Sequence, residues 1–283
     1  MTRTDDDLLA EVNRSGFPLQ IGVEQLFRQQ ETSAGWDWNV RYVEHEWRHE
    51  QSGALGYADI VIENSAGRLN AVLECKRVQN AEWIFLHEQS SEAVTRTKGF
   101  FSAGKDSHVF GWEGIHTKLS SIESQFCVVI GEASDKTRPM LERVSATLVQ
   151  AVEALAQEDS HYELASNAKM YFPVIVTTAR LKLCSYEAGK IELTTGSLRA
   201  ARMQDAQFVR FRKQLSAEPG VIAKSEQLTS RLVAAAKEST VFVVNIDHLK
   251  HFFRYFALLD EESIRKIQDR LAYGRVPAKS RAS

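Results

Sequence analysis

Continuous apolar runs alternate with amphipathic segments along much of this chain. Three runs have the composition of buried strands, at 125–131 (QFCVVIG), 170–179 (MYFPVIVTTA) and 241–246 (VFVVNI). Between the first two, apolar residues fall on one side of a helix over 139–158. Buried strands separated by helices are typical of an α/β protein with a mixed central sheet.

Shorter patterns extend this order of elements along the chain. Thr4 is expected to cap a helix over 4–13, because three aspartates follow it at the positive end of the helix dipole. Further helices are expected over 19–30, 80–98, 225–237, 248–259 and 261–273, and further strands over 36–47, 181–185, 190–194 and 207–215. Gly, Ser and His are frequent in 99–121, which indicates a long irregular loop.

Charge interrupts an apolar hairpin pattern at 56–77 (GYADIVIENSAGRLNAVLECKR). Asp59 opens the first of its two short strands, and Glu74 and Lys76 end the second. Residues two apart on a strand point to the same face, so Glu74 and Lys76 project together. Pairing of the two strands would bring Asp59 beside them. Two carboxylates and an ammonium are costly to bury unless they pair with one another or bind a metal.

These residue types suit a hard divalent cation. Mg²⁺ prefers oxygen ligands and retains several waters, and Asp59, Glu74 and the backbone carbonyl of Cys75 would supply the protein ligands. Lys76 would orient an attacking water or stabilise charge on a phosphate in the transition state. The pattern therefore predicts metal-assisted phosphodiester hydrolysis. The alternative interpretation is a surface Glu-x-Lys pair at a strand end, which arises by chance in many proteins.

Asp59, fourteen further residues and then Glu74-Cys75-Lys76 resemble the core motif of the PD-(D/E)xK superfamily of restriction-endonuclease-like nucleases. SGFPLQIGVEQLF at 15–27, a strand and then YADIVIE are similar to the N-terminal part of Mrr-like members. The resemblance implies an αβββαβ core within residues 1–195, with 196–283 as an α/β extension packed on it. It also implies cleavage of DNA with Mg²⁺ or Mn²⁺ at Asp59, Glu74 and Lys76, in bacterial defence or repair.

The chain departs from the family pattern at three places. Ala58 stands where the family motif has Pro, and the Gln-x-x-x-Tyr motif of some members is missing after Lys76. The first helix of many relatives carries a ligand-supporting Glu, and that position is Gln20 here. Glu24, one turn later, is carried over as a candidate metal ligand. A non-catalytic protein of the same fold that binds nucleic acid or protein is the alternative function.

The balance of charge limits the way in which this chain could bind nucleic acid. A net charge of −2 excludes a global basic field, so only a local basic surface could contact DNA. The candidate residues for that surface, with phenylalanines interleaved, are Arg199, Arg202, Arg210, Arg212 and Lys213. The alternative interpretation is a solvated strand face over a phenylalanine core.

Other sequence features bear on compartment and partners. The three cysteines are scattered through apolar runs, which is typical of reduced thiols in a cytosolic protein. The first sixteen residues lack the apolar region of a signal peptide, and no run approaches the length of a membrane span. We expect a cytoplasmic protein that binds DNA but no membrane, with a protein partner for target recognition and a homodimeric state as further candidates. No glycine-rich phosphate loop is present, which argues against an ATPase or a dinucleotide enzyme.

Overall fold

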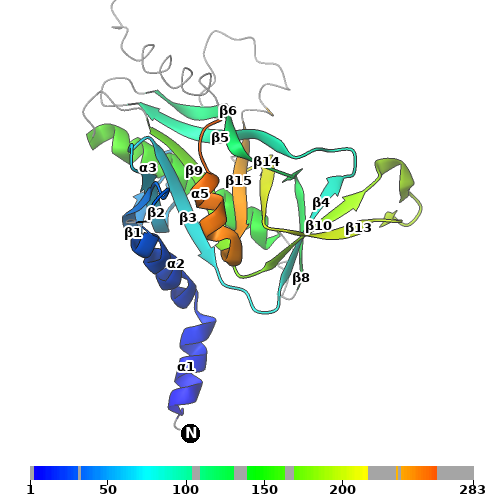
Figure 1. Ribbon diagram of the computed structural model, residues 1–283, viewed down its shortest axis with the longest axis horizontal. Coiled ribbons are helices and arrows are strands. Elements are labelled where there is room, and N and C mark those ends of the chain that lie inside the picture. Colours follow the sequence, from blue (N-terminus) through cyan, green and yellow to red (C-terminus); the bar gives the residue numbers. More distant parts are fainter. Residues whose placement is uncertain are drawn as a thin grey trace, which may run out of the picture.

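The computed structural model describes residues 3–30, 33–103, 109–130, 139–162, 169–215, 234 and 237–259 (Figure 1). This part of the chain is a mixed α/β protein. Its helices are α1 (Asp5–Arg14), α2 (Phe17–Gln30), α3 (Met140–Tyr162) and α5 (Leu249–Tyr255). No helix among the described residues is long and apolar enough to cross a membrane.

A nine-stranded mixed sheet organises the fold. Its main path is β1 (Trp38–Arg48), β2 (Leu55–Asn64), β3 (Leu69–Lys76), β9 (Lys169–Thr177), β15 (Glu238–Asn245), β14 (Phe208–Gln214) and β7 (Glu123–Ser124). Strand β2 is antiparallel to both β1 and β3, whereas β9 is parallel to β3 and to β15. The hairpin of β5 (Val94–Ala103) and β6 (Val109–Ser121) joins this sheet where β5 pairs with the start of β9.

Two hydrophobic clusters cover the two faces of this sheet. One lies under α3, where Leu148 and Val152 pack with Val72 and Ile175 of the sheet. The other lies under α2 and α5 (Figure 1), and its largest members are aromatic. Every residue of β9 is buried, because helices cover both of its faces and neighbouring strands cover both of its edges. The predictions of a buried strand in 170–179 and of a long amphipathic helix before it are confirmed.

A separate four-stranded sheet stands at the right of Figure 1. Its strands, in spatial order, are β13 (Arg202–Ala206), β10 (Arg180–Tyr186), β4 (Glu82–Glu88) and β8 (Phe126–Ile130). The prediction of a strand near 125–131 is confirmed, but the prediction that this strand is buried is wrong. β8 is an edge strand, and Phe126, Val128 and Ile130 expose about half of their surface.

The helix predicted over 80–98 and the loop predicted over 99–121 are both wrong. These residues form β4, β5 and β6 instead. In β4, Trp83, Phe85 and His87 are buried while the residues between them are half-exposed, which is the period of a strand. In β5, a Cβ atom at Gly99 would lie 2.7 Å from the Met170 side chain, so glycine permits the close approach of β5 to β9.

The ends of the chain agree with the expected pattern as far as the structure describes them. The Thr4 hydroxyl accepts from the Asp7 N–H while the Asp7 carboxylate accepts from the Thr4 N–H, so α1 begins with a capping box. Two strands of the predicted extension, β14 and β15, pair within the large sheet. The helix expected at 261–273 and the basic tail lie outside the described residues, as does most of the helix expected at 225–237.

Candidate metal centre

Strands β2 and β3 of the charged hairpin separate at the end that lies away from their connecting turn. Their pairing runs from Glu63–Asn70 to Ile60–Leu73 and goes no further, whereas β3 stays paired with β9 as far as Lys76. Beyond the last pair, the Cys75 N–H donates to Asp59 Oδ2 at 2.6 Å. A carboxylate oxygen therefore takes the acceptor position that a strand carbonyl would occupy if the ladder continued. We call this separation of β2 from β3 at Asp59 and Glu74–Lys76 the fork, and the Cys75 N–H holds the Asp59 side chain in it.

The fork brings Asp59, Glu74 and Lys76 together, as the hairpin pattern predicts. Lys76 Nζ lies 2.6 Å from Glu74 Oε1. Burial and the Glu74 charge raise the pKa of Asp59 to about 7, and the Cys75 N–H and Lys76 offset only part of this rise. Burial acts to lower the pKa of Lys76, but the two carboxylates outweigh it and raise that pKa. The centre thus holds more negative charge than its lysine balances.

Helix α2 contributes Gln20 to the same place. The buried Gln20 amide donates to the backbone oxygen of Asp59 at 3.2 Å and to the carboxylate of Glu44 in β1. Glu44 has a φ of 50°, an uncommon conformation for a residue other than glycine, and its charge also acts to raise the pKa of Asp59. The sequence gives no sign of Glu44, because it lies in an alternating run where it resembles any solvent-facing acid.

Glu24 is not brought to the other candidate ligands. Its carboxylate pairs with Arg28 on the same helix at 2.8 Å, and Gln20 occupies the position next to Asp59. The start of α2 also lies close to the centre, since a Cβ atom at Gly16 would be 3.9 Å from the Cys75 carbonyl oxygen. That oxygen is the further metal ligand that the sequence predicts.

The oxygen atoms at this fork suit a hard cation with few protein ligands. Two carboxylates and a carbonyl are sufficient for Mg²⁺, which keeps several of its waters. Among the described residues, no group of three or more His, Cys, Asp or Glu side chains is arranged to hold a metal ion. Asp59, Glu74 and Lys76 together carry one excess negative charge when all three are ionised, and Glu44 adds a second. A divalent cation would offset both the burial of the Asp59 charge, which is the larger cause of its raised pKa, and its repulsion by Glu74 and Glu44.

The predicted nucleic-acid residues do not form one basic surface. Arg210 is fully buried in β14, where its guanidinium donates to Thr117, Ser121 and the carbonyl of Leu119. Its charge is therefore turned inward, away from any phosphate backbone. The other four residues keep at least part of their surface, and three of them form ion pairs, namely Arg199 with Glu192, Arg212 with Glu123 and Glu238, and Lys213 with Glu142. Arg202 is exposed on β13.

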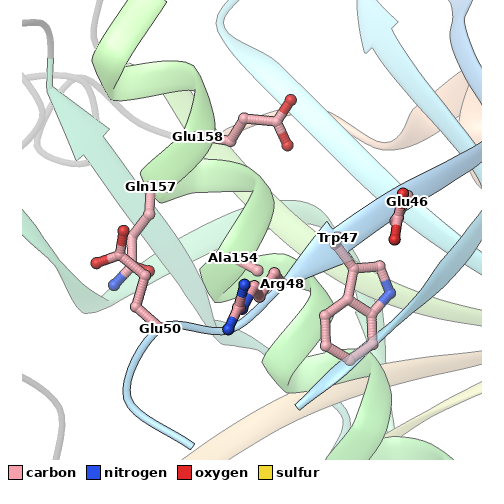
Figure 2. A pocket seen from close by; sticks show the side chains of 7 residues that line it. All are labelled: Glu46, Trp47, Arg48, Glu50, Ala154, Gln157 and Glu158. Atoms are coloured by element: carbon pink, nitrogen blue, oxygen red, sulfur yellow. The ribbon is translucent and has the colours of Figure 1, made fainter. Parts of the chain in front are cut away.

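A cavity of about 410 Å³ lies beside the edge strand β1 (Figure 2). Its wall is formed by Glu46, Trp47, Arg48, Glu50, Ala154, Gln157 and Glu158, so none of the residues at the fork lines it. Next to it, His45 lies 3.1 Å from Glu158 and His49 lies 3.0 Å from Glu153. The two histidines contact different glutamates and do not converge on one ligand position.

Comparison of the chain with protein-family models, with curated proteins and with solved structures finds no match. A functional assignment therefore depends on the geometry of the fork and on the residues of the motif.

Proposed function

We propose that this protein is a divalent-metal-dependent endonuclease that hydrolyses phosphodiester bonds in DNA, with its catalytic centre at Asp59, Glu74 and Lys76. The observation that carries the proposal is the fork between β2 and β3. It holds a half-buried pair of carboxylates, where burial first and the Glu74 charge second raise the pKa of Asp59 to about 7, with one lysine at 2.6 Å from Glu74. Burying two carboxylates costs free energy of folding, and carboxylates with a pKa raised in this way are most common at functional sites.

The order of elements supports a restriction-endonuclease-like core. Helix α2, strands β1 to β3, helix α3 and strand β9 follow one another in the αβββαβ order that the resemblance implies, with β4 to β8 inserted before α3. In space, β1, β2, β3 and β9 are neighbours in that sequence, with α2 and α3 on opposite faces of the sheet. Strand β15 extends the same order beyond β9.

The residues of the fork have separable roles in this proposal. Asp59 and Glu74 would hold Mg²⁺ or Mn²⁺ together with the Cys75 carbonyl. When bound, the cation supplies an acidified water and neutralises charge on the scissile phosphate. The raised pKa of Lys76 keeps this side chain protonated at neutral pH, so it serves as a cation that orients water and stabilises the phosphate, and not as a proton acceptor. Gln20 fixes the position of the Asp59 backbone and of Glu44.

Plasmid cleavage tests this proposal. Wild type should nick or linearise supercoiled DNA with Mg²⁺ or Mn²⁺ and not with EDTA. Lys76→Met should reduce the rate about 100-fold by removing the ammonium that lies 2.6 Å from Glu74. Glu24→Gln is the matched control and should cut at the wild-type rate, because the Glu24 carboxylate forms its ion pair with Arg28 on the same helix and not with a residue of the fork as far as the structure describes the chain. RNA is assayed in parallel. The proposal fails if wild type cuts both DNA and RNA no faster than Lys76→Met does.

Gln20 provides a second, smaller prediction. Gln20→Ala removes the amide that ties α2 to Asp59 and Glu44, and we expect the cleavage rate to fall about 10-fold, in the lower range for residues that orient metal ligands. Cleavage measured over a series of Mn²⁺ concentrations should show that part of this loss is recovered at high metal. A rate equal to that of wild type at low Mn²⁺ would show that Gln20 does not position the centre.

A non-catalytic binding protein of the same fold is the alternative. Gln20, at the position where relatives of the resembled family carry a Glu, favours it. In that case DNA is bound without cleavage and the carboxylates need not take up a cation, so metal binding separates the two functions.

A further inference from the structure

Helix α1 stands apart from the body of the protein (Figure 1). None of its residues is buried, and its apolar residues Leu8, Leu9 and Val12 each expose about half of their surface. The exposed apolar surface continues onto α2 through Phe17 and Ile21. Five of the fourteen large hydrophobic residues that are exposed in the described part of the chain lie in this short segment, which marks it as an interaction surface.

A helix of this length is not expected to persist in water without a packing partner. It has ten residues, and isolated helices shorter than about 12–15 residues are marginal. The capping box at Thr4 and the ion pair of Arg14 with Glu11 stabilise its two ends but bury no apolar surface. The apolar stripe of α1 should therefore be covered in the assembled protein.

The charges of α1 restrict what can cover it. Its four acids, Asp5, Asp6, Asp7 and Glu11, outnumber its one base, Arg14, which gives a net charge of −3. Pairing of α1 with its own copy would bring these acids together, and a nucleic-acid backbone would be repelled as well. The partner that fits is an apolar surface with basic residues beside it.

A segment of this chain has that chemistry. Residues 261–273 (EESIRKIQDRLAY), which lie outside the described residues, carry Ile264, Ile267 and Leu271 at helical spacing with basic residues between them. From 260 to 283 the sequence contains six bases, Arg265, Lys266, Arg270, Arg275, Lys279 and Arg281, and four acids, Asp260, Glu261, Glu262 and Asp269, for a net charge of +2, and three of the four acids precede the apolar residues. Its apolar spacing and its charge both complement α1.

We propose that the C-terminal segment of a second copy of this chain docks on α1. The described chain ends near β6, where the Leu259 N–H donates to the His116 carbonyl, and α1 lies at the opposite end of the molecule (Figure 1). A contact between two copies brings these distant surfaces together without stretching the segment across one molecule. In a two-fold dimer each copy gives its C-terminal segment and receives its partner's, so two such contacts form per dimer. The proposal does not depend on nuclease activity.

Light scattering during size-exclusion chromatography of the full chain tests the proposal. Wild type should elute as a dimer at micromolar concentration, and a variant with Leu8→Ser, Leu9→Ser and Val12→Ser should elute as a monomer with the thermal unfolding curve of the wild-type core. Leu193→Ser, at a residue that is 89% exposed elsewhere, is the matched control and should remain dimeric. A monomeric wild type would overturn the proposal, as would a dimer that survives the triple substitution.

Charge-reversal substitutions test whether the C-terminal segment is what covers α1. Asp5→Lys, Asp6→Lys and Glu11→Lys leave the Thr4–Asp7 capping box intact and should dissociate the dimer. Combining them with Arg265→Glu, Lys266→Glu and Arg270→Glu should restore it, since the signs again match. If the combined variant stays monomeric, or if removal of residues 260–283 leaves the dimer unchanged, the C-terminal segment is not what covers α1.

Discussion

Asp59→Asn is expected to make the metal-free protein more stable at pH 8 and, in the same variant, to reduce DNA cleavage about 1,000-fold. Burial and the Glu74 charge hold the pKa of Asp59 at about 7 in the folded protein, against 3.8 for an unperturbed carboxyl. The ionised form is therefore disfavoured on folding, and this group lowers the free energy of unfolding progressively as pH rises from about 4 to about 7. Asparagine removes the charge and keeps an oxygen that can accept the Cys75 N–H.

Urea unfolding in EDTA at several pH values measures this effect. The gain in free energy of unfolding should be about 2 kcal/mol at pH 8 and smaller at pH 5, because below pH 7 the folded wild type is already protonated at Asp59. Glu24→Gln should stay within about 0.5 kcal/mol of wild type at every pH. A variant that is no more stable than wild type at pH 8 would show that burial and the Glu74 charge do not disfavour the ionised form of Asp59 in the folded protein.

Arg210→Ala is expected to lower the free energy of unfolding by about 3 kcal/mol. The arginine is fully buried, and its hydrogen bonds to Thr117, Ser121 and the Leu119 carbonyl tie β14 to β6. Alanine leaves those acceptors and hydroxyls without their donor and opens a cavity beside Phe242, whose ring centroid lies 5.1 Å from the guanidinium carbon.

Arg210→Met separates packing from charge. Burial lowers the pKa of Arg210 to about 10, which shows that the fold bears a cost for holding this charge. Methionine fills most of the volume and removes that cost, but it leaves the same hydroxyls and the Leu119 carbonyl without a donor, so its loss should be smaller than that of alanine, about 2 kcal/mol. Chemical denaturation of both variants, with the exposed Arg202→Ala as control, checks the order. Equal losses in Arg210→Ala and Arg202→Ala would contradict the buried position.

The charged hairpin could be predicted because its signal is local. Asp59, Glu74 and Lys76 lie on adjacent strands joined by a short turn, and the apolar run into Glu74 marks where the strand ends. Glu44 could not be predicted in this way. It reaches the site through a left-handed backbone conformation and through a hydrogen bond from α2, and neither leaves a pattern in the sequence.

The errors in the fold have a common cause in long-range pairing. Apolar residues such as Ile84 and Phe85 fit a helix as well as a strand, and β4 becomes a strand through parallel pairing with β10, about a hundred residues later. Arg210 alternates with its neighbours as a solvent-facing residue would, but β6 approaches β14 and turns its side chain into the interior. The pairing of β4 with β10 and the contact of β6 with β14 join residues far apart in the sequence, so local periodicity cannot predict either of them.

In the proposed function Asp59 and Glu74 jointly bind a divalent cation, and calorimetric titration with Mn²⁺ measures that binding. Wild type should bind one Mn²⁺ per chain at this site and should lose that binding in Asp59→Asn and in Glu74→Gln, while Glu24→Gln retains it. If Mn²⁺ binding persists unchanged in Glu74→Gln, or if wild type binds no Mn²⁺ at all, Asp59 and Glu74 do not form a shared cation site.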